Sequence, residues 1–554
     1  METLRLHLSA LDYAIIGVYF VVVLGIGFVA RLSIKTDIDF FLSGRSLPAW
    51  ITGLAFMAAN LGALEILGQA ANGAQYGVPA VHYYWIGAVP AMVFLGLVMM
   101  PFYYGAKVRS VPEYLRLRFN EATHAFNAIT FALATVLISG VNLFALALII
   151  HLLLGWTVAV AILAAAALVL AYITLGGLTS AIYNEVLQFF VIVAALLPLT
   201  IVALHSVGGI HGLDARVRAD PKLGEPALHA FRGLAIHHVT NPLKSDWVGV
   251  VFGLGFVLGF GYWTTNFAEV QRALSANNMS AARRTPLIGA IPKTFLPAII
   301  IVPGLIAAVT VKGLGGSSLS LQYNTAIPHL IGNFLPEGML GIAVTGLLAA
   351  FMAGVAANVT SFNTVVTYDL IQSYVVKDRD SDYYLRAGRL VTVAGVLVSV
   401  ATAFIAKGYS NIMNYIQTLF SIFNAPLFAT FIIAMFWKRA SAWGGFCSIV
   451  AGTAAAYVVN RLNAYHTVFH FGSALSASFW QAIIAFLVDG GVLVVVSLVT
   501  PAKPVEDLRG LVWGLTRKEA PEQEDPRDKL WWRSPALLGG VTLAVLVVLN
   551  IVFA

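Results

Sequence analysis

Four ionisable side chains lie within long apolar stretches of the sequence, and their chemistry is the first indication of what the chain does. They are Glu65, Glu185, Lys293 and Asp489. A charge inside a hydrocarbon layer costs about 2.5–3.5 kcal/mol or more, so each such group needs a partner, a cavity or a ligand. Carboxylate and ammonium groups in these surroundings can hold a polar solute or a cation.

Glu65 and Lys293 are the strongest candidates for a functional role. Glu65 follows an irregular stretch at 58–62 and can point into a cavity, whereas Lys293 lies among apolar residues between two prolines. A lysine so placed should face a cavity, a carboxylate or a solute. Glu185, near the start of its apolar stretch, is expected either at an interface or along the inner half of a pathway.

Two other carboxylates favour structural roles. Glu269 lies near the end of an apolar stretch and close to Arg272, so it is expected to be an interfacial carboxylate. Asp489 stands beside two glycines in a late apolar stretch, and a structural or interfacial role is expected for it as well.

The composition sets the class of protein that must position these groups. Of 554 residues, 59% are hydrophobic and only 11% are charged, whereas soluble proteins are about 45–50% apolar and about 25% charged. This excludes a soluble enzyme, a nucleic-acid-binding protein and a disordered scaffold. The net charge of +7 is attributed to basic cytoplasmic loops, so no nucleic-acid partner is expected. The single cysteine, Cys447, excludes an internal disulfide framework and a cysteine metal site.

Apolar stretches of roughly 20 residues predict membrane-spanning helices. The predicted fold class is an all-α polytopic membrane protein with about 14 transmembrane helices, the first of which is a retained helix rather than a cleaved signal. The predicted spans are about 12–30, 50–75, 78–106, 124–151, 156–174, 178–205, 247–271, 284–311, 338–374, 385–406, 411–436, 440–460, 473–499 and 534–553.

Positive charges support this map, because Lys and Arg collect in every second loop. Short cytoplasmic loops are enriched in these residues. An even number of helices then places both termini outside, in a plasma (inner) membrane. The two largest segments outside the membrane are predicted at 205–246 and 501–533.

Two spans carry residues that disfavour a regular helix. The second contains Ala-Ala-Asn-Leu-Gly at 58–62, and the seventh contains four glycines between Gly253 and Gly261. If the first helix is set aside, these segments open two successive blocks of five helices. Interrupted helices in corresponding positions of two halves are the best sequence indication of a transporter site. Tight helix packing is the alternative interpretation.

No catalytic constellation is present in the sequence. It contains no HExxH motif, no phosphate-binding loop with its lysine and no GxSxG elbow. Five histidines between His205 and His238 are more consistent with a solvated loop than with a metal site. No catalytic residue and no enzyme activity are therefore predicted.

The sequence resembles the sodium/solute symporter family from about Asp12 to Trp437, with weaker similarity beyond. The fragments that carry the resemblance keep their order over most of this range. They are DFFLSGR at 39–45, AANLG at 58–62, VPEYLRLRF at 111–119, GG at 176–177 with YNEVLQ at 183–188, YWTTN at 262–266, VQR at 270–272, TYD at 367–369 and YIQ at 415–417.

The resemblance implies a LeuT-type fold of two inverted five-helix repeats, at 50–206 and 247–437, with 12–30 as an extra helix and 440–554 as accessory helices. It implies that the protein lies in the lipid bilayer and carries a small-molecule substrate past a central site by alternating access. It also implies which residues line the solute site, with Tyr262 as the gate: Asn60, Glu65, Tyr84, Tyr262, Trp263, Lys293 and Gln417.

The sequence departs from the sugar-transporting relatives at two positions of that site. Tyr84 stands where they carry a carboxylate, and Gly259 stands where they carry a polar residue. These differences argue against an unchanged hexose site. A sugar, a carboxylate and an amino-acid-like solute all remain open as substrates.

A third departure concerns the ion. The family's sodium site corresponds to backbone carbonyls of Ala58, Leu61 and Ala350, plus two hydroxyl positions that are here Ala353 and Gly354. Sodium is a hard cation that prefers oxygen ligands, so this site is degenerate.

Glu185 replaces an aspartate that is common in relatives, and it is a candidate ion-coupling residue for sodium or for a proton. Sodium is the expected driving ion and no other cofactor is expected. A proton-coupled or uncoupled transporter is the alternative.

Two other classes of membrane protein compete with a secondary transporter. A transport-like sensor would need a fused signalling domain, for which the cytoplasmic segment 501–533 is too short. An ion channel would conduct without saturating uptake. A membrane enzyme is disfavoured because no catalytic constellation is present.

Overall fold

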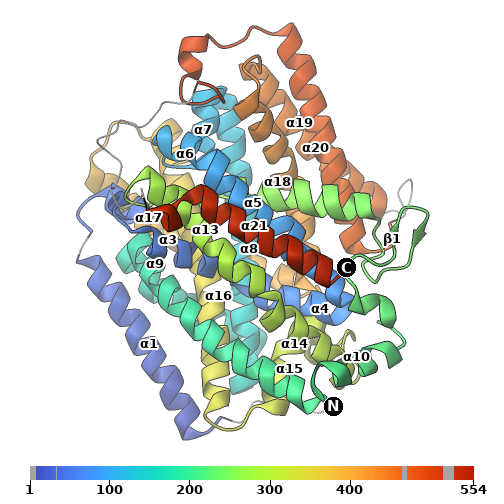
Figure 1. The fold of residues 1–554 in the computed structure, drawn as a ribbon. Coiled ribbons are helices and arrows are strands. Elements are labelled where there is room, and N and C mark those ends of the chain that lie inside the picture. The colour runs from blue at the N-terminus through green and yellow to red at the C-terminus, as the bar shows by residue number, and fades with distance from the viewer. Residues whose placement is uncertain (1–7, 33, 465–470, 516–529) are drawn as a thin grey trace.

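The computed structural model describes the chain except residues 1–7, 33, 465–470 and 516–529, and long helices dominate it (Figure 1). A backbone in hydrocarbon must satisfy its own hydrogen bonds, which favours helices. Among the described residues, eleven helices are long and apolar enough to cross a membrane, and two bent helix pairs bring the number to thirteen. A shorter apolar helix, Val158–Ala171, matches the remaining predicted span.

The N-terminal part of the chain forms ten helices that begin with α1. These are α1 (Ala10–Arg31), α2 (Asp37–Leu42), α3 (Ala49–Asn60), α4 (Ala70–Tyr76), α5 (Val89–Phe94), α6 (Met100–Gly105), α7 (Val111–Arg118), α8 (Glu121–Leu154), α9 (Val158–Ser206) and α10 (Gly209–Ala219).

A two-stranded antiparallel hairpin follows α10 and precedes the remaining helices. These later elements are β1 (Leu234–Ala235), β2 (His238–Val239), α11 (Phe260–Thr265), α12 (Phe267–Leu274), α13 (Met279–Phe295), α14 (Pro297–Thr310), α15 (Ala326–Phe334), α16 (Met339–Thr364), α17 (Ser381–Ala406), α18 (Ile412–Phe436), α19 (Ala442–Ala464), α20 (Ala474–Val499) and α21 (Pro535–Val552).

Several spans contain wider, π-helical turns. These are Leu64–Gln69, Tyr83–Ala88, Leu95–Met99, Gly249–Gly259 and Val365–Val375. Short π-helical turns inside α-helices are frequent at functional sites. Together with α3, α5, α11 and α16, these turns make up spans that were predicted from hydropathy.

The first predicted break is confirmed at the end of α3. The chain bends by 57° between Ala49–Asn60 and Leu64–Tyr76. The backbone amide of Ala63, just before the second half of the bent pair, donates to Asn142 Oδ1 of α8 at 2.8 Å. The amide side chain of another helix therefore satisfies a donor that the break exposes.

The second predicted break is confirmed between α11 and α12, which bend by 48°. Asn266 leaves the helical conformation with ψ 111°, and its own side chain accepts from the backbone of Ala268 at 3.0 Å. Asn is a favoured N-cap residue, so this break carries its own cap.

Helix α16 lies in the interior of the bundle and packs against α9 and α8. It carries small residues at every fourth position, and all of them are buried: Thr345, Ala349, Ala353, Ala357 and Ser361. A Cβ at Gly346 would overlap Ala195 of α9, so the two helices meet without room for a side chain.

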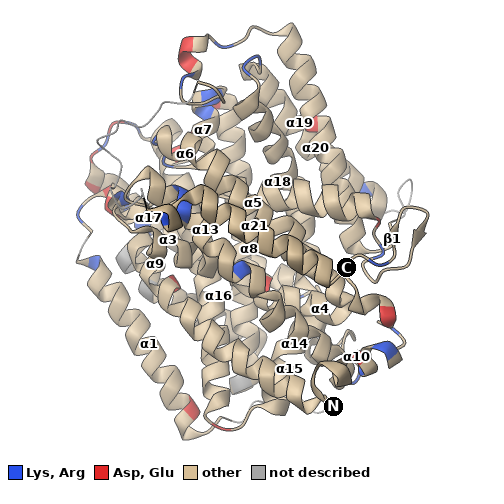
Figure 2. Ribbon diagram, viewed as in Figure 1, with Lys and Arg blue, Asp and Glu red and all other residues tan. Residues whose placement is uncertain are grey.

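Charged residues gather at loops and helix ends, and few lie within the body of the bundle (Figure 2). In Figure 1, α1 lies along one side of the bundle and α19 and α20 lie at the opposite side. Helix α21 runs across the front and packs on α13 and α5. Helices α1, α19 and α20 therefore lie at the periphery of the bundle in this view.

A pair of glycines brings α4 and α14 into backbone contact. Gly73 lies against the carbonyl group of Ile301, and Gly304 lies against that of Ala70. A Cβ on Gly304 would come within 3.0 Å of the Ala70 carbonyl oxygen, so α14 would have to move.

We expect Gly304→Ala to lower the melting temperature of the purified protein, although alanine is the better helix former. Overpacking costs about 1–3 kcal/mol, which exceeds the roughly 1 kcal/mol gained in helix propensity. Gly540→Ala is the matched control, because nothing lies within 4 Å of a Cβ there. Equal melting temperatures for the two variants in detergent would contradict this close contact.

Candidate solute-binding site

The two charges singled out in the sequence form a buried ion pair. Lys293 of α13 lies 2.5 Å from Glu65 Oε1, and its ammonium group also donates to Asn60 Oδ1 at 2.5 Å. Lys293 is 1% exposed and Glu65 is 4% exposed. Removing either partner from a buried pair leaves an uncompensated charge, so each charge holds the other in place.

Aromatic side chains surround this ion pair. Tyr84 donates a hydrogen bond from its hydroxyl to Glu65 Oε2 at 2.6 Å. The ammonium nitrogen of Lys293 lies 4.8 Å from the ring centre of Tyr84 and 5.0 Å from that of Trp263. A cation close to the face of an aromatic ring is attracted by the ring's quadrupole. The pair therefore has a hydrogen-bonded carboxylate and an aromatic cradle for the ammonium group.

Tyr262, the predicted gate, connects this pair to a further carboxylate. Its hydroxyl accepts from Asn60 Nδ2 at 2.9 Å and donates to Glu269 Oε1 at 2.7 Å. Its ring lies 4.8 Å from that of Phe420. Tyr262 therefore packs against α18 on one side and is held by hydrogen bonds on the other, and its role as a gate stays a prediction.

The expectation that Glu269 is interfacial is wrong, because this residue is only 1% exposed. Arg272, its neighbour in sequence, pairs instead with Glu185 of α9. The Arg272 guanidinium donates to Glu185 Oε2 at 3.1 Å and also bonds to Oε1. Since both carboxylate oxygens of Glu185 are taken, this residue is not a free acceptor in this conformation, and its ion-coupling role stays a prediction.

A small cavity of about 40 Å³ adjoins the ion pair, and Gln417 contributes to its wall. The Gln417 amide donates to the sulfur of Met413 at 3.3 Å, and its Oε1 has no partner among the described residues. Solute pockets usually measure about 300–1,000 Å³. The site is therefore closed, and all seven predicted site residues contribute to the ion pair, its cradle or this cavity.

The sodium positions implied by the resemblance are also buried, but they lack side-chain oxygens. Ala58 and Leu61 lie at the first break, and Ala350, Ala353 and Gly354 lie in α16. Several oxygen ligands are needed to hold a hard cation, and only backbone carbonyls are available from these residues. The five residues do not fit a complete sodium site.

Asn142, which the sequence indicates only as a polar residue within a span and a candidate for helix packing, occupies the space beside these positions. Its Oδ1 lies where a Cβ on Gly62 or on Gly354 would stand. Its Nδ2 donates to the carbonyl of Ile138 at 3.2 Å within α8. The glycines at 62 and 354 are the feature of the sequence that could have indicated this role, because each makes room for the Asn142 amide.

The other candidates from the sequence are structural or remote. Asp489 is buried, not interfacial, and both its oxygens accept from Thr430 of α18, at 3.1 and 2.9 Å, so its structural role stays a prediction. No group of metal-ligating side chains lies within the residues that the structure describes.

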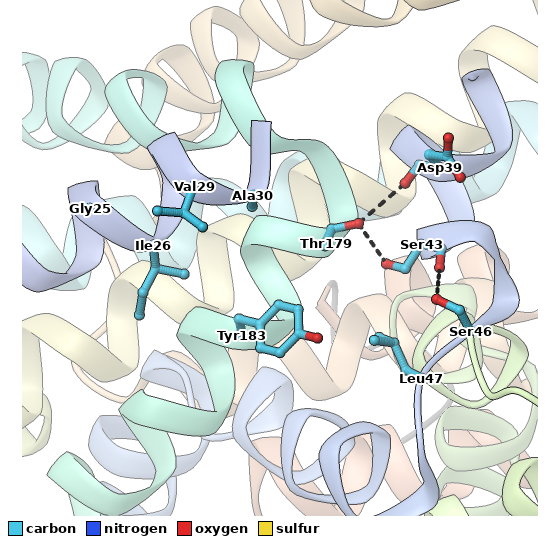
Figure 3. A pocket seen from close by; sticks show the side chains of 10 residues that line it. All are labelled: Gly25, Ile26, Val29, Ala30, Asp39, Ser43, Ser46, Leu47, Thr179 and Tyr183. Carbon is cyan, nitrogen blue, oxygen red and sulfur yellow. Dashed lines mark hydrogen bonds between the residues drawn. The ribbon is translucent and has the colours of Figure 1, made fainter. Parts of the chain in front are cut away.

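A pocket of about 670 Å³ lies between α1, α2 and α9 (Figure 3), away from the ion pair. Its polar side chains are satisfied locally, since Thr179 donates to the Asp39 carbonyl and lies in hydrogen-bond contact with Ser43. Its wall also contains Tyr183 and Ser46 beside Ile26, Val29 and other apolar groups, and none of the seven predicted site residues lines it.

Solved structures with the same architecture are transporters. A sodium-coupled sialic acid symporter matches with a TM-score of 0.73 at 19% identity, covering 89% of this chain and 99% of that one. MHP1, a nucleobase-cation-symport-1 family transporter, matches with a TM-score of 0.53 at 15% identity over 85% of this chain and 97% of that one. The chain thus has the LeuT-type fold of two inverted five-helix repeats, which is a transporter fold.

The sequence comparisons then define the family. The model of the sodium:solute symporter family matches residues 40–452, so the chain belongs to this family. A sodium/glucose cotransporter 4 of Danio rerio is 29% identical, covering 96% of this chain and 85% of the relative. A sodium/mannose cotransporter of Bos taurus is 28% identical, covering 99% and 97%. The protein is an integral membrane transporter of a small solute, not an enzyme.

We expect Lys293→Ala and Glu65→Ala each to abolish solute uptake in proteoliposomes without preventing membrane insertion. Each variant leaves a buried charge alone, which costs about 3–5 kcal/mol, so both should also melt at lower temperature. The double variant Glu65→Gln with Lys293→Met should recover stability but not uptake. Lys312→Ala, at an exposed lysine, is the control, and near-normal uptake by both single variants would show that the charges are structural.

Proposed function

We propose that this protein imports a small polar solute by alternating access, with the inward sodium gradient as the driving force. The observation that carries the proposal is the Lys293–Glu65 pair, buried beside a cavity between two broken helices. Family membership supports sodium as the driving ion. A proton remains the alternative coupling ion because the sodium positions lack side-chain oxygens.

The proposed moving parts are two repeats at 50–206 and 247–437. The bends in their first helices, after Asn60 and at Asn266, support these bounds, because both occur at corresponding positions. Helix α1 and the helices from α19 onward would then be accessory.

The closed cavity supports alternating access. It is several times smaller than an ordinary solute pocket, so a solute enters only when the walls separate. Tyr262 and Phe420 form the wall that must open, and their rings meet within the second repeat. Opening would also break the hydrogen bond by which Asn60 of the first repeat holds Tyr262.

The chemistry of the cavity supports a neutral solute that carries several hydroxyl groups. The ion pair is neutral overall, so a net charge on the solute would stay unbalanced. Rings of Trp263 and Phe420 supply apolar faces, and Asn60 and Gln417 supply amides. The names of the relatives, sodium/glucose and sodium/mannose cotransporters, support the same class.

Tyr84 provides a reason why this class is compatible with the altered site. It takes the position of a carboxylate in the sugar-transporting relatives, but its hydroxyl donates to Glu65. The carboxylate is thus supplied by Glu65 from the first broken helix. An amino-acid-like zwitterion is the second candidate, because Lys293 and Glu65 offer one charge of each sign.

We expect a hexose or a related polyol, added to the purified protein with sodium, to raise its melting temperature. A ligand at about 100 times its Kd stabilises the native state by roughly 2.7 kcal/mol. Sugars, amino acids and carboxylates are screened at fixed pH with sodium or with N-methylglucamine. Stabilisation by amino acids alone would identify an amino-acid-like zwitterion as the substrate class. No stabilisation by any class of solute would contradict the proposed site.

We also propose that both chain termini lie outside. In a Cys447→Ser background, His237→Cys in the outer loop should react with a membrane-impermeant maleimide on intact cells. Arg379→Cys, in the loop after α16, should react only after permeabilisation, because basic loops stay in the cytoplasm. Both positions are exposed, so the reverse labelling pattern would show that the topology is the opposite of the one proposed.

A further inference from the structure

Glu269 is a third buried carboxylate on the helices around the first break. The other two, Glu65 and Glu185, each have their own cation, Lys293 and Arg272. Glu269 forms no salt bridge among the described residues. Its Oε1 accepts from Tyr262, and its Oε2 is buried without any hydrogen-bond partner among the described residues. A buried anion without a partner is costly, so this site calls for a cation.

The surroundings of Glu269 do not supply that cation. Among the elements packed against α12, α3 and α16 contain no charged residue. Helix α13 carries Lys293, which is bonded to Glu65, and α12 itself carries Arg272, which is bonded to Glu185. Both cations act on Glu269 through space, but the negative charge of Glu185 opposes them. Helix α13 also carries Arg283 and Arg284, which donate to the backbone carbonyls of Gly96 and Ser280.

The other titratable groups near α12 have partners of their own. The two aspartates of α2 lie close to that helix's N-terminus, where Asp39 accepts from Thr36 and Asp37 accepts from Tyr368. On α6, Tyr103 donates to the carbonyl of Thr264 at 3.0 Å. None of these groups is a cation. Glu269 is therefore left with one neutral hydrogen bond, from Tyr262.

Glu269 is connected to the solute cavity by a chain of hydrogen bonds. The order is Glu269, Tyr262, Asn60, Lys293 and Glu65. While Glu269 is ionised, the Tyr262 hydroxyl is held as its donor and closes the cavity. Once a cation neutralises the carboxylate, this bond weakens, because a hydrogen bond to a charged group is the stronger one. The state of Glu269 can thus control the gate.

Asn142 explains why a new cation position is needed. Its amide oxygen lies between Gly62 and Gly354, beside the family's sodium positions, and accepts from the backbone of Ala63. An amide can hold the two backbones together as an ion would. Because the Asn142 amide is part of the chain, it cannot dissociate as an ion does. No ion gradient can therefore drive transport through this position.

We propose that Glu269 binds the coupling cation of this transporter, and that Asn142 takes the structural place of the ion at the family's sodium positions. The ligand is a monovalent cation that neutralises a buried carboxylate: a proton needs only the free Oε2 of Glu269, whereas sodium would need further oxygens to move towards it. The inference rests on the proposed cation-driven transport, but it names a different residue and a different test.

The test measures cation binding to the purified protein without any solute. Melting temperatures are recorded against sodium, replaced by N-methylglucamine, at fixed pH, and against pH without sodium. A sodium site predicts stabilisation that saturates with sodium. A proton site predicts stability that falls as pH rises, since the native state then holds a proton that the unfolded chain releases.

We expect Glu269→Gln to remove whichever response the wild type shows, or to raise the sodium concentration needed about ten-fold or more. Asp489→Asn is the control for the sodium response, because both oxygens of this buried carboxylate already accept from Thr430. Glu506→Gln, at an exposed carboxylate, is the control for the pH response. Asn142→Ala should lower the melting temperature yet keep the cation response.

The proposal is overturned if Glu269→Gln keeps the wild-type response, if Asn142→Ala alone abolishes it, or if the wild type responds to neither cation. Because no solute is present, each of these results leaves the solute site untouched. Failure of the solute screen with an intact cation response would instead contradict the proposed function.

Discussion

The buried pair of Lys293 and Glu65 is the interaction on which the site depends. A charge in a low-dielectric interior must be matched, and this requirement fixes how α13 faces the segment after α3. The surrounding groups follow from it: Asn60 and Tyr84 satisfy the remaining hydrogen-bonding capacity, and Trp263 covers the ammonium group. A solute that enters has to compete with contacts that are already complete.

The two broken helices make this arrangement possible by different means. An interrupted helix exposes backbone donors that must be satisfied. The break before α12 is capped locally by Asn266, whereas the break after α3 is capped by Asn142 from α8. The first break therefore depends on a neighbouring helix, and any movement of α8 relative to α3 would remove its cap. The second break can move as a unit.

Much of the fold was predictable because hydropathy and glycine content are local properties. The spans, both breaks, and the pairing partners Glu65 and Lys293 were all indicated by residue type and position. The partner of Arg272 was not, because a carboxylate three residues away, Glu269, is the obvious local choice. The structure instead selects Glu185, 87 residues away in sequence. The role of Asn142 was not predictable for the same reason, since it depends on two distant glycines, Gly62 at the first break and Gly354 in α16.

The π-helical segments described above have a mechanical consequence. Each wide turn inserts one extra residue into the spiral, so that a carbonyl loses its usual partner and the following side chains rotate around the axis. The segments Leu64–Gln69, Tyr83–Ala88 and Gly249–Gly259 flank the cavity and contribute residues to its wall. The directions in which these lining side chains face are therefore set by the wide turns and would differ in a regular α-helix.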